Sequence, residues 1–353
     1  MSRKAIKRST ALIFYYNPDG QLTGENYISG KLSVISPPVL GVLQSLDDYT
    51  GYDEVLGRLS YVPEAAALVT SLIDRDILIE EQSDIARSEA TLDTWEWDLP
   101  ARYYHSRTNY VNFEANNDYV LSKLDEKALE RKPPSPYFHI DRLDYQPLPE
   151  PGRLPQKDIQ DVLLERRTCR NFTGDPVSSQ QLSDLLYYSF GKTSEFRAGS
   201  IGDVIFRTSP SGGARHPAEV YVVLNKVEDY QAGIYHYSTQ YHSLGLIQVG
   251  DFRAWGVQVC SMQEWMEGTA FFCILTSMLR RNMWKYENSH AYRVINMDLG
   301  HLGQTFHLTC TAMGLGPFTT AALNCRMIEE KLQNDPYLQP ALYVCAAGWA
   351  GQG

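Results

Sequence analysis

Along the first 84 residues, apolar positions recur in short bursts that are separated by turn-forming residues. Residues 10–34 predict two short strands around an Asn-Pro-Asp-Gly turn at 17–20. Three short helical patterns follow, and the apolar run 77–79 closes the segment. Three small helices with short strands are typical of a winged-helix-like module. A peptide-docking role and plain structural support both fit such a module.

Residues 85–155 have no sustained apolar period and contain seven prolines between 133 and 155. We expect an irregular, extended connection here, with one helix at about 119–130. No internal repeat is visible, so a repeat architecture is not indicated.

From residue 156 the pattern changes to that of a mixed α+β domain that continues to residue 353. Residues 178–190 predict a helix with Ser178 and Gln181 as a capping box. A second, long apolar helix is predicted at 292–313. The remaining predicted elements are a helix at 158–166, strands at 220–224, 271–276 and 342–347, and a hairpin of 233–237 with 243–247.

The composition is that of an ordinary folded protein, with 43% hydrophobic and 21% charged residues. The formal net charge is −10, which argues against nucleic acid as the main partner because binding to phosphates requires a basic face. The six cysteines form no C-x-x-C pair and no His/Cys group with zinc spacing, so no metal site is predicted.

The N-terminal apolar run, 11–16, is too short for a signal peptide, and no stretch approaches the roughly 20 apolar residues of a membrane span. We therefore expect a cytoplasmic protein that does not enter the membrane. The many tyrosines, 23 in all, suit half-wet surfaces such as ligand clefts and subunit interfaces.

Four stretches in the second half could carry chemistry, although each has an ordinary structural explanation. The sequence ERRTCRNF at 165–172 gathers three arginines, whose planar guanidinium groups suit a phosphate; a solvated basic patch is the alternative. The sequence RTSPSGGARHPAEVYVV at 207–223 permits close backbone approach at two glycines. It matches neither common nucleotide-binding glycine pattern, and a plain turn before a strand is the alternative.

The other two stretches flank the long predicted helix. In WKYENSHAYR at 284–293, Lys285 and Tyr286 could transfer protons if burial lowers the lysine pKa, whereas an exposed loop is the alternative. In MGLGPFTTAAL at 313–323, Gly314 is predicted to be the C′ residue of the helix. Its backbone could pack on a flat ring, or it could simply stop the helix.

Taken together and in this order, these stretches resemble the nitroreductase-fold flavoenzymes, and within them the SagB-type dehydrogenases. The segments GIYHY at 233–237 and AYRVINMDLGHLGQ at 291–304 extend the resemblance to about 200 residues. It implies an α+β, nitroreductase-like, FMN-binding domain at 156–353, after an irregular connection at 85–155 and a winged-helix-like module at 1–84. It also implies a homodimer with FMN at the subunit interface.

The resemblance implies a set of cofactor-binding residues. The phosphate and ribityl chain are assigned to the first cluster, with help from Arg215, and the ring is assigned to the two glycine turns, one of them from the partner subunit. Gln304 is assigned to the ring as well. The full set is Arg166, Arg167, Thr168, Arg170, Pro210, Ser211, Gly212, Gly213, Arg215, Gln304, Gly314, Leu315 and Gly316. The chain departs from many relatives in having no Lys or Arg after Lys331, where a basic tail residue often meets the phosphate.

The resemblance further implies an azoline oxidase that converts thiazoline or oxazoline rings to azoles in a ribosomal-peptide or carrier-bound product, with a cyclodehydratase as a possible partner. Lys285 is then the base that removes the Cα proton, and Tyr286 is its partner or the alternative base. Two alternatives stay open at this point. One is an NAD(P)H-fed FMN reductase of nitro, quinone or dehydroamino-acid substrates, and the other is a peptide-binding scaffold that has lost its flavin.

Overall fold

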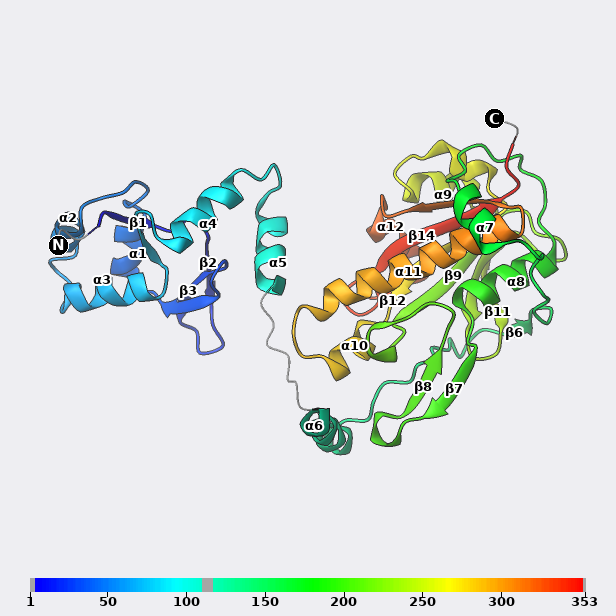
Figure 1. Cartoon of the computed structure of the whole chain (residues 1–353), viewed down its shortest axis with the longest axis horizontal. Helices are drawn as coiled ribbons and strands as arrows, with labels where there is room; N and C mark the ends of the chain where they lie inside the picture. The colour runs from blue at the N-terminus through cyan, green and yellow to red at the C-terminus, as the bar shows by residue number, and fades with distance from the viewer. Residues whose placement is uncertain (1–3, 110–116, 352–353) are drawn as a thin grey trace. The chain divides into compact units, whose positions relative to one another are not determined.

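A computed structural model describes residues 4–109 and 117–351, which fall into two compact units, 1–112 and 113–353 (Figure 1). The three helices predicted near the N-terminus are α1 (Pro37–Leu43), α2 (Tyr52–Arg58) and α3 (Ala65–Asp74), which pack on one apolar cluster. Among the described residues, no helix is both long and apolar enough to cross a bilayer.

The strands of the first unit form two small sheets. Strands β2 (Leu12–Tyr16), β3 (Leu22–Asn26) and β4 (Lys31–Val34) form an antiparallel sheet in that order, so β2 and β4 are its edges. Strand β1 (Ile6–Arg8) pairs with β5 (Leu78–Glu80). The sequence prediction had two strands in 10–34, and the structure adds β4.

The stretch expected to be irregular contains two further helices, α4 (Asp84–Asp93) and α5 (Leu99–Asn109), ahead of the anticipated α6 (Asn117–Glu130). Their low apolar content hid them from a periodicity analysis. A local signal was present, however, because the Ser83 hydroxyl accepts from the Ala86 amide as an N-cap. Residues 131–144 are irregular as expected, and β6 (Tyr145–Pro147) follows.

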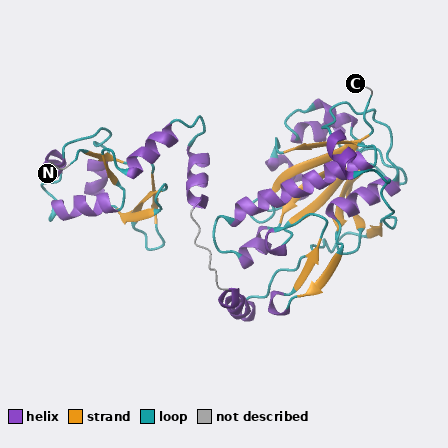
Figure 2. Ribbon diagram, viewed as in Figure 1, coloured by secondary structure: helices purple, strands orange, loops and turns teal. Residues whose placement is uncertain are grey.

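The second unit is built on a seven-stranded antiparallel sheet in the order β13-β14-β12-β9-β10-β11-β6. Figure 2 shows the strands of the protein in orange and its helices in purple. Its central strands are β9 (Ala218–Leu224), β12 (Phe271–Ser277) and β14 (Ala341–Gly348), flanked by β10 (Gly233–Ser238), β11 (Ser243–Val249) and β13 (Gly316–Thr320). The predicted central strands and the β10–β11 hairpin are confirmed. Strands β7 (Ser194–Arg197) and β8 (Asp203–Phe206) form a separate hairpin.

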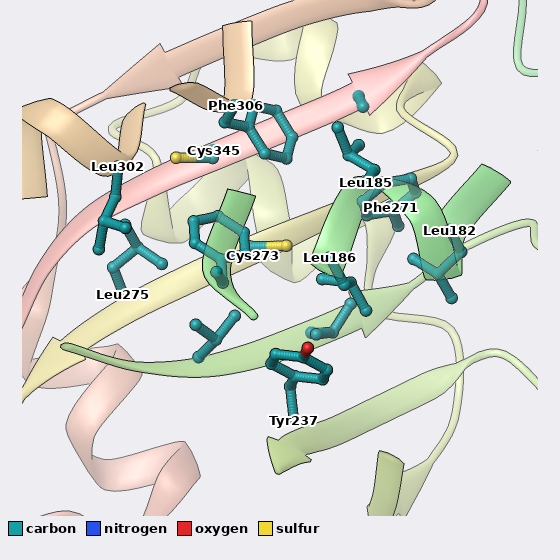
Figure 3. Close-up of a cluster of buried hydrophobic side chains, with 14 of the residues drawn as sticks. Leu182, Leu185, Leu186, Tyr237, Phe271, Cys273, Leu275, Leu302, Phe306 and Cys345 are labelled. Carbon is teal, nitrogen blue, oxygen red and sulfur yellow. The ribbon is translucent and has the colours of Figure 1, made fainter. Parts of the chain in front are cut away.

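Helices cover both faces of this sheet, which explains why its central strands are almost continuously apolar. On β9, Val220 and Val222 join a cluster with α8 (Ser179–Phe190) and α11 (Ala291–Ala312), as Figure 3 shows for part of that cluster. Tyr221 and Val223, which alternate with them, face α9 (Arg253–Val259) and α12 (Cys325–Leu332). The long helix α11 therefore runs along one face of the sheet.

The ends of α8 and α11 follow the sequence signals. The capping box of Ser178 and Gln181 is confirmed at the start of α8. At the end of α11, Gly314 has φ +75, its amide donates to the Thr311 carbonyl, and the Leu315 amide donates to the Cys310 carbonyl. This is the Schellman arrangement expected for a glycine at C′.

Candidate functional site

The glycine-rich stretch that precedes β9 is anchored to the middle of α11. Ser211 Oγ donates to Asp298 Oδ2 at 2.6 Å, and the Gly212 amide donates to Asp298 Oδ1 at 3.0 Å. The backbone of Gly213 then adopts a left-handed conformation at φ 62. Burial raises the pKa of Asp298, and the two hydrogen bonds oppose that rise. The buried carboxylate thus fixes the turn to the helix.

Lys285 and Tyr286 end the short helix α10 (Leu279–Lys285) and lie against this turn. Lys285 Nζ donates to the Gly213 carbonyl at 3.2 Å and lies 5.5 Å from the centre of the Tyr286 ring. Burial and, after it, the Arg215 guanidinium lower the pKa of Lys285. Burial also raises the pKa of Tyr286; the Arg215 guanidinium opposes that rise, and the Asp298 carboxylate adds to it. The pair therefore consists of a lysine that loses its proton more readily than usual and a tyrosine whose hydroxyl stays protonated.

Arg215 is brought to the same place. Its side chain is buried, its guanidinium carbon lies 5.6 Å from the centre of the Trp284 ring, and Nη2 donates to the Pro134 carbonyl at 3.5 Å. We call Gly213, Arg215, Lys285, Tyr286 and Asp298 the base cluster. The structure places Arg215 in this cluster, away from the three arginines of 166–170 with which it was expected to share a phosphate.

Behind the base cluster lies a buried ion pair. Arg281 Nη2 lies 2.6 Å from Glu219 Oε1, and both side chains are almost fully buried. Burial favours the neutral carboxyl, but the Arg281 guanidinium and the His236 ring outweigh it, so the pKa of Glu219 is lowered. Arg281 also donates to the Ser135 carbonyl at 2.9 Å and to the His216 carbonyl at 3.0 Å. The pair therefore ties α10, β9 and residue 135 together.

Arg166 is positioned by the far end of α11. The residue caps α7 (Ile159–Glu165), and its Nη1 donates to His307 Nδ1 at 3.4 Å. The other ring nitrogen of His307 is then the protonated one, which donates to Thr319 Oγ1 at 3.2 Å. Burial and then the Arg166 charge lower the pKa of His307 to about 4, so the ring is a neutral acceptor near pH 7.

The remaining residues of 166–170, which with Arg166 we call the arginine cluster, lie beside the second glycine turn. The Cys169 amide donates to the Pro317 carbonyl at 2.7 Å, and a Cβ added to Gly316 would lie 2.8 Å from Cys169 Sγ. Arg170 lies over the Trp265 ring at 5.5 Å. The stretches 165–172 and 313–323, which the resemblance assigned to one cofactor, are therefore adjacent.

The exposed positions of the arginine cluster suit a soluble anion. Thr168, Arg170 and Gly314 are solvent-exposed, and a Cβ at Gly314 would meet no atom within 4 Å. Guanidinium groups and a hydroxyl are suitable donors for a phosphate. Arg167 has a different use, because its Nη1 donates to the carbonyls of Leu164 and Arg166 at the end of α7.

The base cluster and the arginine cluster lie at different levels of α11. Asp298 marks the first and His307 the second, nine residues apart, which corresponds to about 14 Å along a helix. Pro210 and Gln304 are exposed, and Leu315 is buried. The expected site residues thus form two groups within one chain rather than one.

Several residues of these clusters were missed in the sequence. Asp298 and His307 were expected only as parts of an apolar helix, and Glu219, Arg281 and Trp284 were not singled out. A charged residue inside a strongly apolar helical pattern is a usable signal, because such residues are rarely buried without a purpose. The Glu219–Arg281 pair had no such signal, since it joins residues 62 positions apart.

No metal centre accompanies the clusters within residues 4–109 and 117–351. There, no three His, Cys, Asp or Glu side chains gather as a metal ion would require.

Comparison with known proteins places the second unit in a family. The family model "Nitroreductase family" matches residues 163–349, more than half of the chain. The trifolitoxin-processing protein TfxB of Rhizobium leguminosarum bv. trifolii is 31% identical over 162 residues, which cover 45% of this chain and 43% of TfxB. The trifolitoxin operon protein TfxC of the same organism is 23% identical over 297 residues, covering 80% and 81%.

Among solved structures, a chain of the E. coli microcin synthetase McbBCD complex with truncated pro-MccB17 bound overlaps with a TM-score of 0.47 at 20% identity. The overlap covers 72% of this chain and 92% of that one. On the match of the family model to residues 163–349, which include both clusters, the chain belongs to the nitroreductase family, a group of oxidoreductases.

Proposed function

We propose that the protein is an FMN-dependent dehydrogenase that oxidises azoline rings to azoles in a ribosomal-peptide or carrier-bound product. The observation that carries the proposal is the placement of Lys285 against the Gly213 carbonyl, partly buried and next to Tyr286. A reductase fed by NAD(P)H needs no strong base at this place, whereas ring oxidation does. A lysine that gives up its proton readily is suited to that role.

FMN is the cofactor that the family resemblance implies, and the arginine cluster fits its phosphate. Arg166 and Arg170 would hold the phosphate, with Thr168 as a hydroxyl donor, while Gly314 leaves room for close approach of a ring. When bound, FMN supplies the acceptor for a hydride from Cβ of the azoline and passes both electrons to an external oxidant. We expect no residue of the C-terminal segment after Lys331 to add positive charge there.

The residues of this chain account for the proton. Lys285, as the neutral amine, takes the proton from Cα of the azoline, so that one proton and one hydride leave the ring and a C=C bond forms. Tyr286, whose pKa is raised by burial, stays protonated and donates a hydrogen bond beside the lysine. Asp298 keeps the Gly212–Gly213 turn in place and thereby the carbonyl to which Lys285 is bound.

A complete site on this proposal requires two chains. The family resemblance implies FMN at a subunit interface, so one cofactor with its substrate would use the arginine cluster of one subunit and the base cluster of its partner. Exposed apolar side chains support a subunit contact on this side of the domain. They lie on α7 and α11: Ile159, Leu163, Leu164 and Met297.

The peptide nature of the substrate is supported by the relative TfxB, a trifolitoxin-processing protein. The first unit offers two edge strands, β2 and β4, to which an extended leader peptide could add a strand. A cyclodehydratase would be the enzyme that supplies the azoline. These assignments of substrate, partner and docking unit are part of the proposal.

The test uses the FMN-loaded protein and an azoline-containing peptide under single-turnover conditions. We expect Lys285→Ala to slow flavin bleaching by about 10²–10⁴-fold, the usual contribution of a general base. Lys123→Ala, an exposed lysine on α6, is the matched control and should behave as the wild type. Equal rates for Lys285→Ala and the wild type would refute the base assignment. Bleaching by NADPH but not by the peptide would favour the reductase instead.

A further inference from the structure

The guanidinium of Arg215 is buried without a carboxylate partner. The side chain is 2% exposed, and its Nε and Nη1 atoms are buried with no hydrogen-bond partner. The nearby buried carboxylate of Glu219 is engaged by Arg281 at 2.6 Å. A buried charge without a partner of opposite charge generally costs several kcal/mol. An unpaired buried guanidinium is therefore unusual where the side chain has only a structural role.

Two contacts hold the unpaired guanidinium at the end of α10. It lies over the Trp284 ring at 5.6 Å, and Nη2 reaches the Pro134 carbonyl at 3.5 Å. Trp284 is itself fixed, because its Nε1 donates to the Arg131 carbonyl at 2.8 Å. The next residue along α10 is Lys285, and the preceding turn supplies the Gly213 carbonyl that accepts from Lys285. Arg215 therefore lies over the residue that precedes Lys285, two residues after the glycine whose carbonyl accepts from Lys285.

Among the described residues, no carboxylate forms an ion pair with Lys285. The carboxylates on the elements that adjoin the turn are bound by other groups. Asp298 on α11 is bound by Ser211 and Gly212, Lys127 on α6 is paired with Glu287, and Arg281 on α10 is paired with Glu219. His216, in the same turn as Arg215, is buried and its pKa is lowered to about 3 by burial and the arginines, so it adds no charge.

We propose that Arg215 is a positioning residue for the base, whose buried positive charge keeps Lys285 in the neutral amine form. A cation next to an ammonium disfavours the charged state, and the burial of Arg215 reduces the screening of that repulsion by solvent. The role of Lys285 as a base rests on the proposed function. The effect of the Arg215 charge on the protonation of Lys285 does not depend on that function. It also gives Arg215 a role other than phosphate binding.

The experiment measures Lys285 directly in the FMN-loaded protein. Each lysine is acetylated with a limiting pulse of acetic anhydride at a series of pH values, and the modified fraction is read by mass spectrometry. In the wild type, Lys285 should reach half-maximal labelling at a lower pH than the exposed lysines. In Arg215→Gln that midpoint should move to higher pH, while Arg215→Lys, which keeps the charge, should retain the low midpoint.

Activity provides the second readout. In Arg215→Gln, kcat/KM with the azoline peptide should fall about tenfold at pH 7 and recover as the pH is raised, with the acid limb of the profile displaced in parallel with the labelling midpoint. Arg280→Gln removes an exposed arginine from the same helix and should change neither curve. A merely structural role for Arg215 would lower activity at every pH without displacing the limb.

Each outcome decides the inference. An unshifted Lys285 midpoint in folded Arg215→Gln would overturn it. If that variant does not fold, Arg215→Met takes its place: a Lys285 midpoint at the wild-type pH overturns the inference, and a midpoint displaced to higher pH supports it. Retained turnover in Lys285→Ala would instead remove the proposed base, while the labelling curves would still report on Arg215.

Discussion

Gly213 is the residue of the base cluster whose backbone leaves room for the side chains of Lys285 and Tyr286. Its left-handed backbone is one that side chains with a Cβ adopt only at a cost. A Cβ at this position would also collide with Tyr286 Oη and would lie 2.8 Å from Lys285 Nζ. The absence of a side chain therefore lets the lysine and the tyrosine close over the turn.

Gly213→Ala should accordingly affect both stability and turnover. We expect a loss of about 1–2 kcal/mol in the free energy of unfolding from the left-handed backbone. Turnover should fall by about tenfold to a hundredfold because the base is displaced. Chemical denaturation and single-turnover bleaching measure the two effects. Gly57→Ala on α2, which has open space around it and no positive φ, is the control. Unchanged turnover in Gly213→Ala would show that Lys285 and Tyr286 do not act from this turn.

At the scale of elements, α10 is held by the irregular segment that follows α6. Three side chains donate to carbonyls within five consecutive residues: Trp284 to Arg131, Arg215 to Pro134 and Arg281 to Ser135. Prolines 133 and 134 have no amide hydrogen, so this part of the segment cannot enter a regular ladder. The segment instead uses its carbonyls to fix the helix that ends in Lys285.

Arg281→Met tests this attachment. The change leaves Glu219 buried without its partner and removes the donor to Ser135, so we expect a loss of about 3–5 kcal/mol in the free energy of unfolding. The double variant Glu219→Gln/Arg281→Met should recover part of that loss because the uncompensated charge is gone. Urea denaturation measures both. A single variant as stable as the wild type would mean that the buried pair does not hold α10 in place.

At the scale of the whole molecule, the proposed function places each working site between two subunits, with the arginine cluster of one and the base cluster of the other. The consequence can be tested by pairing two defective chains. An Arg166→Ala/Arg170→Ala chain and a Lys285→Ala chain should each give inactive homodimers. A heterodimer purified through two different tags would contain one intact composite site and one doubly defective site.

We expect that heterodimer to show about half of the wild-type turnover per dimer and to bind about one FMN. Turnover with the azoline peptide and the flavin absorbance per dimer are the measurements. A reference heterodimer in which both changes lie on the same chain, paired with a wild-type chain, leaves each composite site with one defect and should be inactive. The reverse pattern would show that each site is complete within one chain.

The sequence determined the local parts of this protein. Turn glycines, a capping box and apolar periods of 2 and 3.6 residues each act over a few positions, so the capping box at Ser178, the C′ residue Gly314 and the central strands could be predicted from short windows. A fixed order of short stretches likewise indicated the family, which the match over 163–349 confirmed. The helices α4 and α5 escaped because their apolar positions are few.

Only the tertiary structure decided which parts meet. It placed Arg215 with Lys285 instead of with Arg166, and it joined Glu219 to Arg281 across 62 residues. It also separated the expected site into two clusters along α11. The physical reason is that burial and long-range pairing depend on how the sheet and helices pack, whereas a sequence window records only neighbours along the chain.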